Sequence, residues 1–341
     1  MNPQKILIIQ TAFLGDVVLT TPLIKAVKKE YPRSKVFFLL IPQTKELLQN
    51  NPHLDGVIVY DKKNKEKGVS SFLALAGKIR ASGFDLALIP HRSFRSALLA
   101  YLARIPQRIG FDKSSGAFLL TKKIKYIQSQ SEAKRNLSLL EKDIPPENDC
   151  LPGLFPSEDD FKYIEELFRS WDVKREDKIV GVAPGSVWNT KRWLPERFGE
   201  VAESLIEKLG AKVIFIGGKE DEKLCLEIAS NMKSKPLIAA GKTSPLQSAA
   251  LISRCQVILS NDTAPMHIAV AMRVPVVAIF GSTIPEFGFE PTGKDDLIIQ
   301  KEIYCRPCGI HGKRKCPEKH FRCIKEIQTE EVFETVTRKL I

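Results

Sequence analysis

Short apolar runs alternate with helical patterns along the whole chain, and this alternation limits the fold more than any other feature. In the first half the apolar runs are Ile6–Ile9, Val36–Leu40, Gly56–Val59 and Leu86–Ile89. Helical patterns such as Thr21–Tyr31 and Ser71–Ala81 lie between them. Strands that alternate with helices form βαβ units around a parallel sheet. The sequence therefore predicts an α/β protein.

A second series of the same kind follows the segment 144–149, in which two adjacent prolines precede acidic residues, as is typical of linkers. The apolar runs of this series are Lys178–Val182, Val213–Ile216, Leu237–Ala239, Val257–Leu259 and Val276–Phe280. A chain of 341 residues is long enough for two domains with separate cores. We therefore expect two Rossmann-like domains, residues 1–150 and 151–341, whose parallel sheets face each other across a cleft. The last helix, about Thr329–Leu340, is a candidate to pack back on the first domain.

The stretch 256–272 carries the clearest sign of a ligand site. A helical pattern with Pro265 in its first turn directly follows the predicted strand, and Asp262 suits the N-cap of that helix. A helix start offers backbone N–H groups and a partial positive charge, which favour a phosphate. Thr263 and His267 are four residues apart, so they share one helix face near that end. The position predicts a site for a phosphorylated ligand, although the stretch alone also fits a plain helix cap.

Two further strand ends carry residues that suit the same ligand. The loop after the strand at 179–183 contains Gly185, Ser186, Thr190, Lys191 and Arg192. Its glycine permits a close backbone approach, and its cations suit a diphosphate; the alternative is a solvated loop anchored by Trp193 in the core. After the next strand, Glu220 or Glu222 is a candidate to bind ribose hydroxyls.

Two familiar nucleotide-binding motifs are missing. Gly241-Lys242-Thr243 looks like the end of a Walker A motif, but Pro236 stands where that motif requires a glycine. The chain also contains no GxGxxG sequence, which argues against a dinucleotide-dependent oxidoreductase.

In the first half of the chain, as in the second, polar and charged residues follow the predicted strands. Asp16 follows the first strand, where it could remove a proton from an attacking hydroxyl or merely cap a helix. Basic residues follow the strand at 86–89 and also occur near residue 108. The candidates for binding an anionic acceptor are Gly15, Arg92, Arg95 and Arg108.

The net charge of the chain limits the kind of partner that it can be expected to bind. Lys and Arg outnumber Asp and Glu by 52 to 40, which gives a net charge of +12 and indicates an anionic partner. The basic residues form no arginine-rich tract, so nucleic acid is not the expected partner. The chain shows neither a signal-peptide pattern nor a run of about 20 apolar residues, so we expect a cytoplasmic protein that visits a membrane surface.

Four of the seven cysteines cluster near the end of the chain, as Cys305, Cys308, Cys316 and Cys323. Their C-x2-C-x7-C-x6-C spacing permits a structural zinc site, but it is not that of a standard zinc knuckle. Reduced buried thiols or a disulfide are the alternatives. We expect Cys150, Cys225 and Cys255 to be ordinary buried cysteines.

Three motifs, GDVVLTTP at 15–22, PGSVWNTKRWLPERF at 184–198 and SNDTAPMHIA at 260–269, resemble those of the ADP-heptose:lipopolysaccharide heptosyltransferases of glycosyltransferase family 9. The resemblance extends over essentially the whole chain and is greatest to the heptosyltransferase II group. It implies the GT-B fold and an inverting, metal-independent transfer of heptose from ADP-heptose to heptosyl-Kdo2-lipid A, the lipopolysaccharide inner core, at the cytoplasmic face of the inner membrane.

The resemblance also implies a role for each candidate residue. Asp16 would be the catalytic base, and Lys191 would stabilise the departing ADP with the helix start at Thr263. The donor site would consist of Gly185, Ser186, Lys191, Glu220, Asp262, Thr263 and His267. Many members of the family have glycine where this chain has Ala264, whose methyl group could crowd the donor. The alternatives are a GT-B transferase with another nucleotide sugar, or a non-enzymatic module that binds a nucleotide sugar or nucleic acid.

Overall fold

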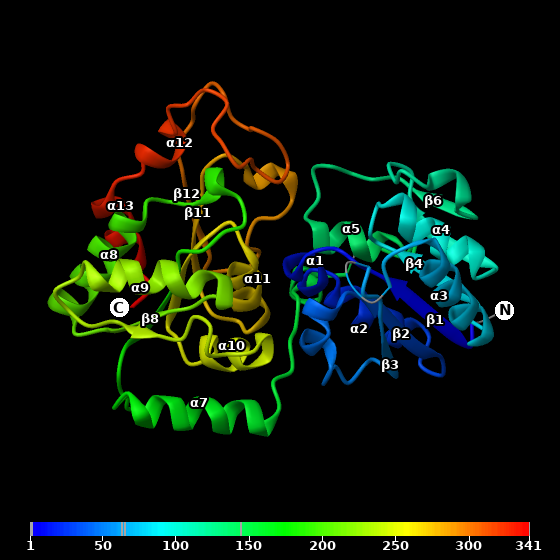
Figure 1. Cartoon of the computed structure of the whole chain (residues 1–341), viewed down its shortest axis with the longest axis horizontal. Helices are drawn as coiled ribbons and strands as arrows, with labels where there is room; N and C mark the ends of the chain where they lie inside the picture. Colours follow the sequence, from blue (N-terminus) through cyan, green and yellow to red (C-terminus); the bar gives the residue numbers. More distant parts are fainter. Residues whose placement is uncertain (1–2, 63, 65, 144, 341) are drawn as a thin grey trace. The chain divides into compact units, whose positions relative to one another are not determined.

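The computed structural model of the chain describes residues 3–62, 64, 66–143 and 145–340. The chain divides into two compact units, Met1–Phe155 and Pro156–Ile341, and each is described by itself (Figure 1). The division falls six residues beyond the proline-rich segment 144–149, of which Ile144 lies outside the described residues. Among the described residues, the helices are all too short or too polar to cross a bilayer.

The first unit is built on a six-stranded parallel sheet in the order β3-β2-β1-β4-β5-β6. Its strands are β1 (Lys5–Ile9), β2 (Lys35–Leu40), β3 (Gly56–Val59), β4 (Leu86–Ile89), β5 (Gln107–Phe111) and β6 (Lys122–Ile124). In the central strand β1, Ile6 lies opposite Val36 of β2 and Leu86 of β4. The chain order reverses between β1 and β4, which makes the gap above these two strands the switch point where open α/β sheets bind ligands.

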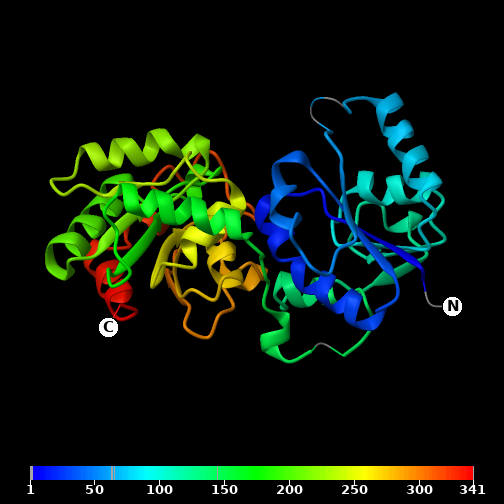
Figure 2. The same cartoon turned by 90° about the horizontal axis from the view of Figure 1, so that it is seen from below.

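Helices cover both faces of this sheet (Figure 2). They are α1 (Leu14–Val18), α2 (Thr21–Glu30), η1 (Pro42–Thr44), η2 (Glu46–Leu48), α3 (Val69–Ala81), α4 (Phe94–Leu102), η3 (Ala117–Leu119), α5 (Glu132–Ser138) and α6 (Glu147–Cys150). Helix α2 packs beside α5, and α3 packs beside α4. Right-handed crossovers put α2 on one face of the sheet and both α3 and α4 on the other, because the chain moves in opposite directions across it. Helix α5, which follows the last strand, joins α2.

The second unit repeats this design, with the strand order β12-β11-β10-β7-β8-β9. Its strands are β7 (Ile179–Ala183), β8 (Lys212–Phe215), β9 (Leu237–Ile238), β10 (Val257–Asn261), β11 (Val276–Phe280) and β12 (Leu297–Gln300). All the pairings are parallel, and the switch point lies between β7 and β10. Strands β7, β10 and β11 are completely buried. The apolar sequences of β7 and β11 predict this, whereas β10 is apolar only up to Leu259 and also buries Ser260 and Asn261.

The helices of the second unit pack on its sheet around a core that includes the fully buried Trp193. They are α7 (Glu158–Ser170), η4 (Asn189–Lys191), α8 (Pro195–Leu209), η5 (Lys219–Asp221), α9 (Glu222–Ser230), α10 (Pro245–Ile252), α11 (Ala264–Ala271), η6 (Pro285–Phe287), α12 (Arg322–Lys325) and α13 (Thr329–Thr337). The final helix α13 packs on α8, in its own unit. Packing of this helix on the first domain stays a prediction.

Candidate active site

Four neighbouring strand ends meet at the carboxyl edge of the second sheet, around its switch point. Gly185 and Ser186 follow β7, Asp262 and Thr263 follow β10, and Thr283 lies three residues beyond β11. The loop after β8 leads into η5. Because β11, β10, β7 and β8 are consecutive in the sheet, their loops form one continuous polar edge.

Lys191 and Asp262 form a buried ion pair at the centre of this edge. The Lys191 Nζ lies 2.6 Å from Asp262 Oδ2, and the two side chains are only 13% and 5% exposed. The same ammonium group donates to the backbone carbonyl of Asp262 at 3.3 Å. The Thr283 hydroxyl donates to Asp262 Oδ2 at 2.7 Å. The pair therefore holds a lysine ammonium in a fixed place where water has little access.

Helix α11 begins one residue later than the sequence analysis expected. Its N-cap is Thr263, with an extended backbone, rather than Asp262. The Asp262 carboxylate cannot serve as the cap because it is turned to Lys191 and Thr283. Pro265 stands in the first turn, as expected. The helix start lies directly beside the ion pair, so its partial positive charge adds to that of Lys191.

His267 is buried one turn into α11 and is uncharged at neutral pH. Burial, with a smaller contribution from the Lys191 charge, lowers the pKa of His267 to about 4, and the Asp262 carboxylate opposes this only in part. A neutral imidazole can either donate or accept a hydrogen bond without adding charge. The sequence analysis grouped His267 with Thr263 on one helix face, and the structure places it beside Lys191 and Asp262.

The loop after β7 approaches η5 so closely that Gly185 has no room for a side chain. A Cβ there would lie 2.1 Å from Asp221 Oδ1. Burial raises the pKa of Asp221, and the hydrogen bond from Gly218 and the charge of Arg192 partly offset this. The Arg192 Nε donates to the Ser186 carbonyl at 2.6 Å, which fixes the bend of the loop.

The three acidic residues of the β8 loop point to different places. Glu220 is exposed over Gly218, and the carboxylate of Glu222 lies near Gly241, after β9. Asp221, which the sequence analysis passed over, lies against Gly185 instead. Asp221 Oδ2 accepts a hydrogen bond from Gly218 N–H at 3.1 Å, at the i, i+3 spacing of a capping box. That spacing is the sequence signal that could have identified Asp221.

The cysteine-containing segment folds onto this site through Thr190, which is 2% exposed. The Thr190 hydroxyl accepts bonds from Lys313 N–H at 2.7 Å and from Ser282 Oγ at 2.9 Å. Cys308 N–H donates to the Ser282 carbonyl at 2.9 Å. A Cβ on Gly312 would lie 3.1 Å from Lys191 Cγ. The segment therefore packs directly against the side chain of Lys191.

The four clustered cysteines are reduced thiols in this structure. Burial raises the pKa of Cys323 to about 11, with further contributions from its neighbours, chiefly Cys308. The Cys305 Sγ lies 3.8 Å from His320 Nε2. Within the described part of the chain, however, no group of three or more His, Cys, Asp or Glu side chains is arranged to hold a metal ion. Zinc binding by these four cysteines stays a prediction, which metal analysis of the purified protein tests. Cys150, Cys225 and Cys255 are buried, as expected.

In the first unit, Asp16 lies beside the switch point, in the third position of α1. Its Oδ2 accepts a hydrogen bond from Phe13 N–H at 3.1 Å, so the carboxylate caps the start of this helix. The side chain is only partly buried. Both readings from the sequence thus remain compatible with its position, since a capping carboxylate can also accept a proton.

A basic group follows β4 at the other side of the same switch point. His91 Nδ1 lies 3.1 Å from Thr11 Oγ1 and 2.9 Å from Ser96 Oγ. Burial, with the charges of Lys62 and Arg92, lowers the pKa of His91 to about 4. Lys62 Nζ donates to the Thr11 carbonyl at 2.7 Å. Lys62 therefore belongs to this basic group, although the sequence did not indicate it.

The two arginines of this group stack on aromatic rings. The Arg92 guanidinium lies 4.2 Å from the ring centre of Tyr126. That of Arg95 lies 5.8 Å from the ring centre of Phe72 and donates to the Tyr60 hydroxyl at 3.3 Å. Stacking leaves the edges of a guanidinium available to an anion.

Arg108 does not join this group. It is the second residue of β5, which places it near the opposite, amino edge of the sheet. Its Nε donates to the Leu119 carbonyl at 2.8 Å, and its guanidinium also donates to the Ile105 carbonyl at 2.5 Å. These contacts fix the start of β5 and give Arg108 a structural role.

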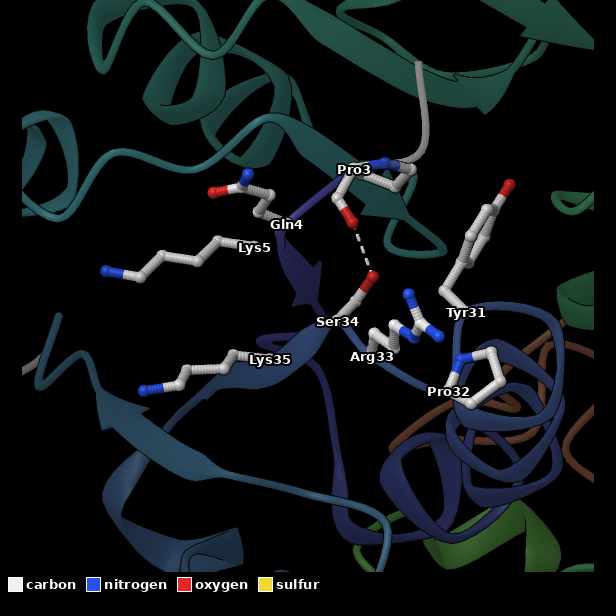
Figure 3. A pocket seen from close by; sticks show the side chains of 8 residues that line it. All are labelled: Pro3, Gln4, Lys5, Tyr31, Pro32, Arg33, Ser34 and Lys35. Carbon is white, nitrogen blue, oxygen red and sulfur yellow. Dashed lines mark hydrogen bonds between the residues drawn. The ribbon is translucent and has the colours of Figure 1, made fainter.

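The amino edge of the first sheet also carries an open hollow of about 790 Å³ (Figure 3). It is lined by Pro3, Gln4, Lys5, Tyr31, Pro32, Arg33, Ser34 and Lys35. Figure 3 shows the side chains of Lys5 and Lys35 extending to the same side, and a bond from the Ser34 hydroxyl to the Pro3 carbonyl. The hollow lies at the edge opposite Asp16 and the basic group, so it is not part of the candidate site.

Comparisons with known proteins identify the family and the fold of the chain. The family model of glycosyltransferase family 9 (heptosyltransferase) matches residues 72–321. A lipooligosaccharide heptosyltransferase 2 of Haemophilus ducreyi is 30% identical over 87% of this chain and 88% of its own. A family 9 glycosyltransferase of Veillonella parvula superposes with a TM-score of 0.85 at 26% identity, over 99% and 97% of the two chains. The ADP-heptose lipopolysaccharide heptosyltransferase II of E. coli gives a TM-score of 0.80 at 24% identity, over 98% of each chain. The fold is that of these structures, GT-B.

Proposed function

Because this chain is a glycosyltransferase that belongs to family 9, the heptosyltransferases, we propose that it transfers heptose from ADP-heptose to the inner core of a lipopolysaccharide. The names of its relatives support both substrates. The observation that carries the proposal is the buried ammonium of Lys191, which lies beside the start of α11 at the switch point of the second sheet. Such a place suits a diphosphate.

The second unit binds the donor in this proposal. Lys191 and the start of α11 stabilise the negative charge that develops on the departing ADP, a role that a divalent cation has in other transferases. Gly185 and Ser186 bring the β7 loop close to the diphosphate, while Glu220 is available for the ribose. Asp262, Thr263 and the neutral imidazole of His267 supply hydrogen bonds near the sugar.

The first unit binds the acceptor and supplies the base. Asp16 takes the proton of the acceptor hydroxyl while its oxygen bonds to the anomeric carbon of the heptose. The bond from that carbon to the diphosphate breaks on the opposite side, ADP leaves, and the anomeric configuration is inverted. Gly15, Arg92 and Arg95 are placed to bind the anionic acceptor, heptosyl-Kdo2-lipid A. In this scheme the protein acts peripherally at the cytoplasmic face of the inner membrane.

The experiment compares Asp16→Asn with Asp143→Asn, an exposed carboxylate of the same unit. Each protein is incubated with ADP-heptose and truncated lipopolysaccharide acceptors, and transfer is read as the mass gain of one heptose. We expect Asp16→Asn to lose transfer and to keep its affinity for ADP-heptose in calorimetry, while Asp143→Asn keeps both. Transfer at the wild-type rate by Asp16→Asn would show that Asp16 is not the catalytic base. Transfer from a UDP- or GDP-sugar in place of ADP-heptose would show that ADP-heptose is not the donor.

A further inference from the structure

The excess positive charge of the chain belongs almost entirely to one unit. The first unit, residues 1–155, has 24 Lys and Arg against 13 Asp and Glu, whereas residues 156–341 have 28 against 27. The net charge is therefore +11 for the first unit and +1 for the second. An anionic partner larger than the substrates would be attracted to the first unit.

Exposed apolar side chains occur in the same unit on α3, α4 and η3. Val69 and Leu73, one turn apart on α3, are 75% and 50% exposed. Phe94, the first residue of α4, and Phe118 of η3 are also exposed, the latter by 73%. Single exposed apolar residues are common on proteins, but four on three elements, of which α4 contacts both α3 and η3, indicate an interaction surface.

The fold brings these four residues to one side of the sheet. Helices α3 and α4 lie side by side, and both begin at the carboxyl edge (Figure 1). Arg95 of α4 reaches across to the ring of Phe72, which lies next to Leu73 in α3. The rings of Phe94 and Phe118 stack with their centres 6.1 Å apart. Two helix starts and one short loop thus present the patch together.

The aromatic pair is held in its outward position by the backbone. A Cβ on Gly116 would lie 2.7 Å from Ala97 Cβ and 3.3 Å from Phe94 Cα, so the loop before Phe118 packs tightly on α4. Ser115 N–H also donates to the Arg92 carbonyl at 3.1 Å. Because the loop is fixed in this way, Phe118 cannot fold into the core without breaking these contacts.

Exposed cations surround the patch. Lys67 lies two residues before Val69, Arg95 follows Phe94, and Lys113 lies in the loop that leads to Phe118. Apolar side chains between exposed lysines and arginines are typical of surfaces that insert shallowly into a bilayer while the cations pair with lipid phosphates.

We propose that this docking face, formed by Val69, Leu73, Phe94 and Phe118 with Lys67, Arg95 and Lys113, binds the surface of an anionic lipid bilayer. The inference deepens the proposed function, since it puts the carboxyl edge that carries Asp16 and Arg92 next to the membrane that holds a lipid-linked acceptor. A bilayer suits the face better than a folded protein, because a dense layer of phosphates complements the net charge of the whole unit as well as the patch.

The test measures co-sedimentation of the full chain with phosphatidylcholine vesicles, with and without phosphatidylglycerol, in the absence of donor and acceptor. We expect wild-type protein to bind the anionic vesicles. The double variant Phe94→Ser/Phe118→Ser should bind about tenfold more weakly, as should Lys67→Glu/Lys113→Glu. Leu226→Ser, which removes a similarly exposed leucine from α9 of the second unit, is the matched control and should bind like wild type.

Two further measurements keep the outcomes separate. The midpoint of urea denaturation should be unchanged in all variants, which shows that the first unit, where the substitutions lie, is folded. ADP affinity in calorimetry and transfer to a delipidated acceptor should be unchanged as well. The proposal fails if wild type ignores anionic vesicles, or if Phe94→Ser/Phe118→Ser binds them as wild type does. It also fails if light scattering shows that the aromatic pair instead holds two copies together. If vesicle binding follows the expectation but ADP-heptose is not turned over, the docking face stands and the proposed function falls.

Discussion

Lys191 and Asp262 depend on each other because neither charge has much access to water. Their contact at 2.6 Å compensates both charges, and Thr283 supplies a further hydrogen bond to the carboxylate. Removing one partner from a buried pair leaves the other charge desolvated, which costs more than the net worth of the pair. Variants of Lys191 therefore change stability as well as chemistry, and the two effects need separate measurements.

A double-mutant cycle with Lys191→Met and Asp262→Asn measures this dependence. We expect each single change to lower the free energy of unfolding by about 3–5 kcal/mol, because each strands a buried partner. The double variant should lose clearly less than the sum, since it strands neither charge. Urea denaturation followed by fluorescence gives the three values, and losses that simply add would show that the two side chains are not coupled.

His91 and His267 should make stability depend on pH. Both have folded pKa values near 4, below the ordinary 6.5, so the unfolded chain binds more protons between these values. Stability should therefore be fully present above pH 6.5 and fall as pH decreases toward 4, by up to about 3 kcal/mol for each histidine. Urea denaturation at a series of pH values checks this. His267→Gln should flatten the decline, because it removes one of these two groups, whose pKa values are lowered in the folded state.

At the scale of elements, the site consists of strand ends tied together by the cysteine-containing segment. The strand ends could be predicted, because buried parallel strands have unbroken apolar sequences that run into polar loops. The same reasoning would have found Thr283 if it had been applied to the end of β11. The hydrogen bonds between Thr190 and Lys313 could not be predicted, since they join residues 123 positions apart in an irregular segment.

Other elements escaped prediction for local reasons. Strand β5 opens with the polar residues Gln107 and Arg108, and β6 has only three residues, two of them lysine. Neither has enough apolar periodicity to indicate a strand; each is defined by its neighbour in the sheet. Arg108 was misassigned for the same reason. Its place at the amino edge follows from strand register, which composition does not encode.

Gly312 and Gly309 offer a matched test of how the segment positions Lys191. Both have positive φ angles, +76° and +128°, so alanine strains the backbone at either position. At Gly309 the added methyl group meets nothing within 4 Å, whereas at Gly312 it lies 3.1 Å from Lys191 Cγ, Ser282 Oγ and Thr190 Oγ1. We expect Gly312→Ala to weaken ADP binding about tenfold and Gly309→Ala to leave it near wild type, as measured by calorimetry. Equal affinities would mean that the segment does not position the lysine.

At the scale of the whole molecule, two units of nearly the same topology differ sharply in charge. Both sheets have the order of a Rossmann fold, with the switch point beside the first strand of each unit. Their net charges are nevertheless +11 and +1, so we expect the two units to bind different kinds of anionic partner. In the second unit, 27 acidic residues balance the 28 Lys and Arg, and the buried ammonium group of Lys191 suits one small anion. The first spreads cations over its surface, where they act together on an extended one.

This difference predicts that added salt weakens binding to an anionic membrane surface much more than it weakens binding of ADP. Exposed charges are screened over about 10 Å at 0.1 M ionic strength and about 3 Å at 1 M, while buried pairs are screened much less. Raising NaCl from low concentration toward 1 M should therefore lower kcat/KM for an acceptor embedded in anionic vesicles far more than it lowers the affinity for ADP. A delipidated acceptor should show an intermediate loss, since it keeps its own charges but lacks the surface. Equal salt dependence of transfer to the embedded and delipidated acceptors would show that the charge of the first unit acts on the sugar alone.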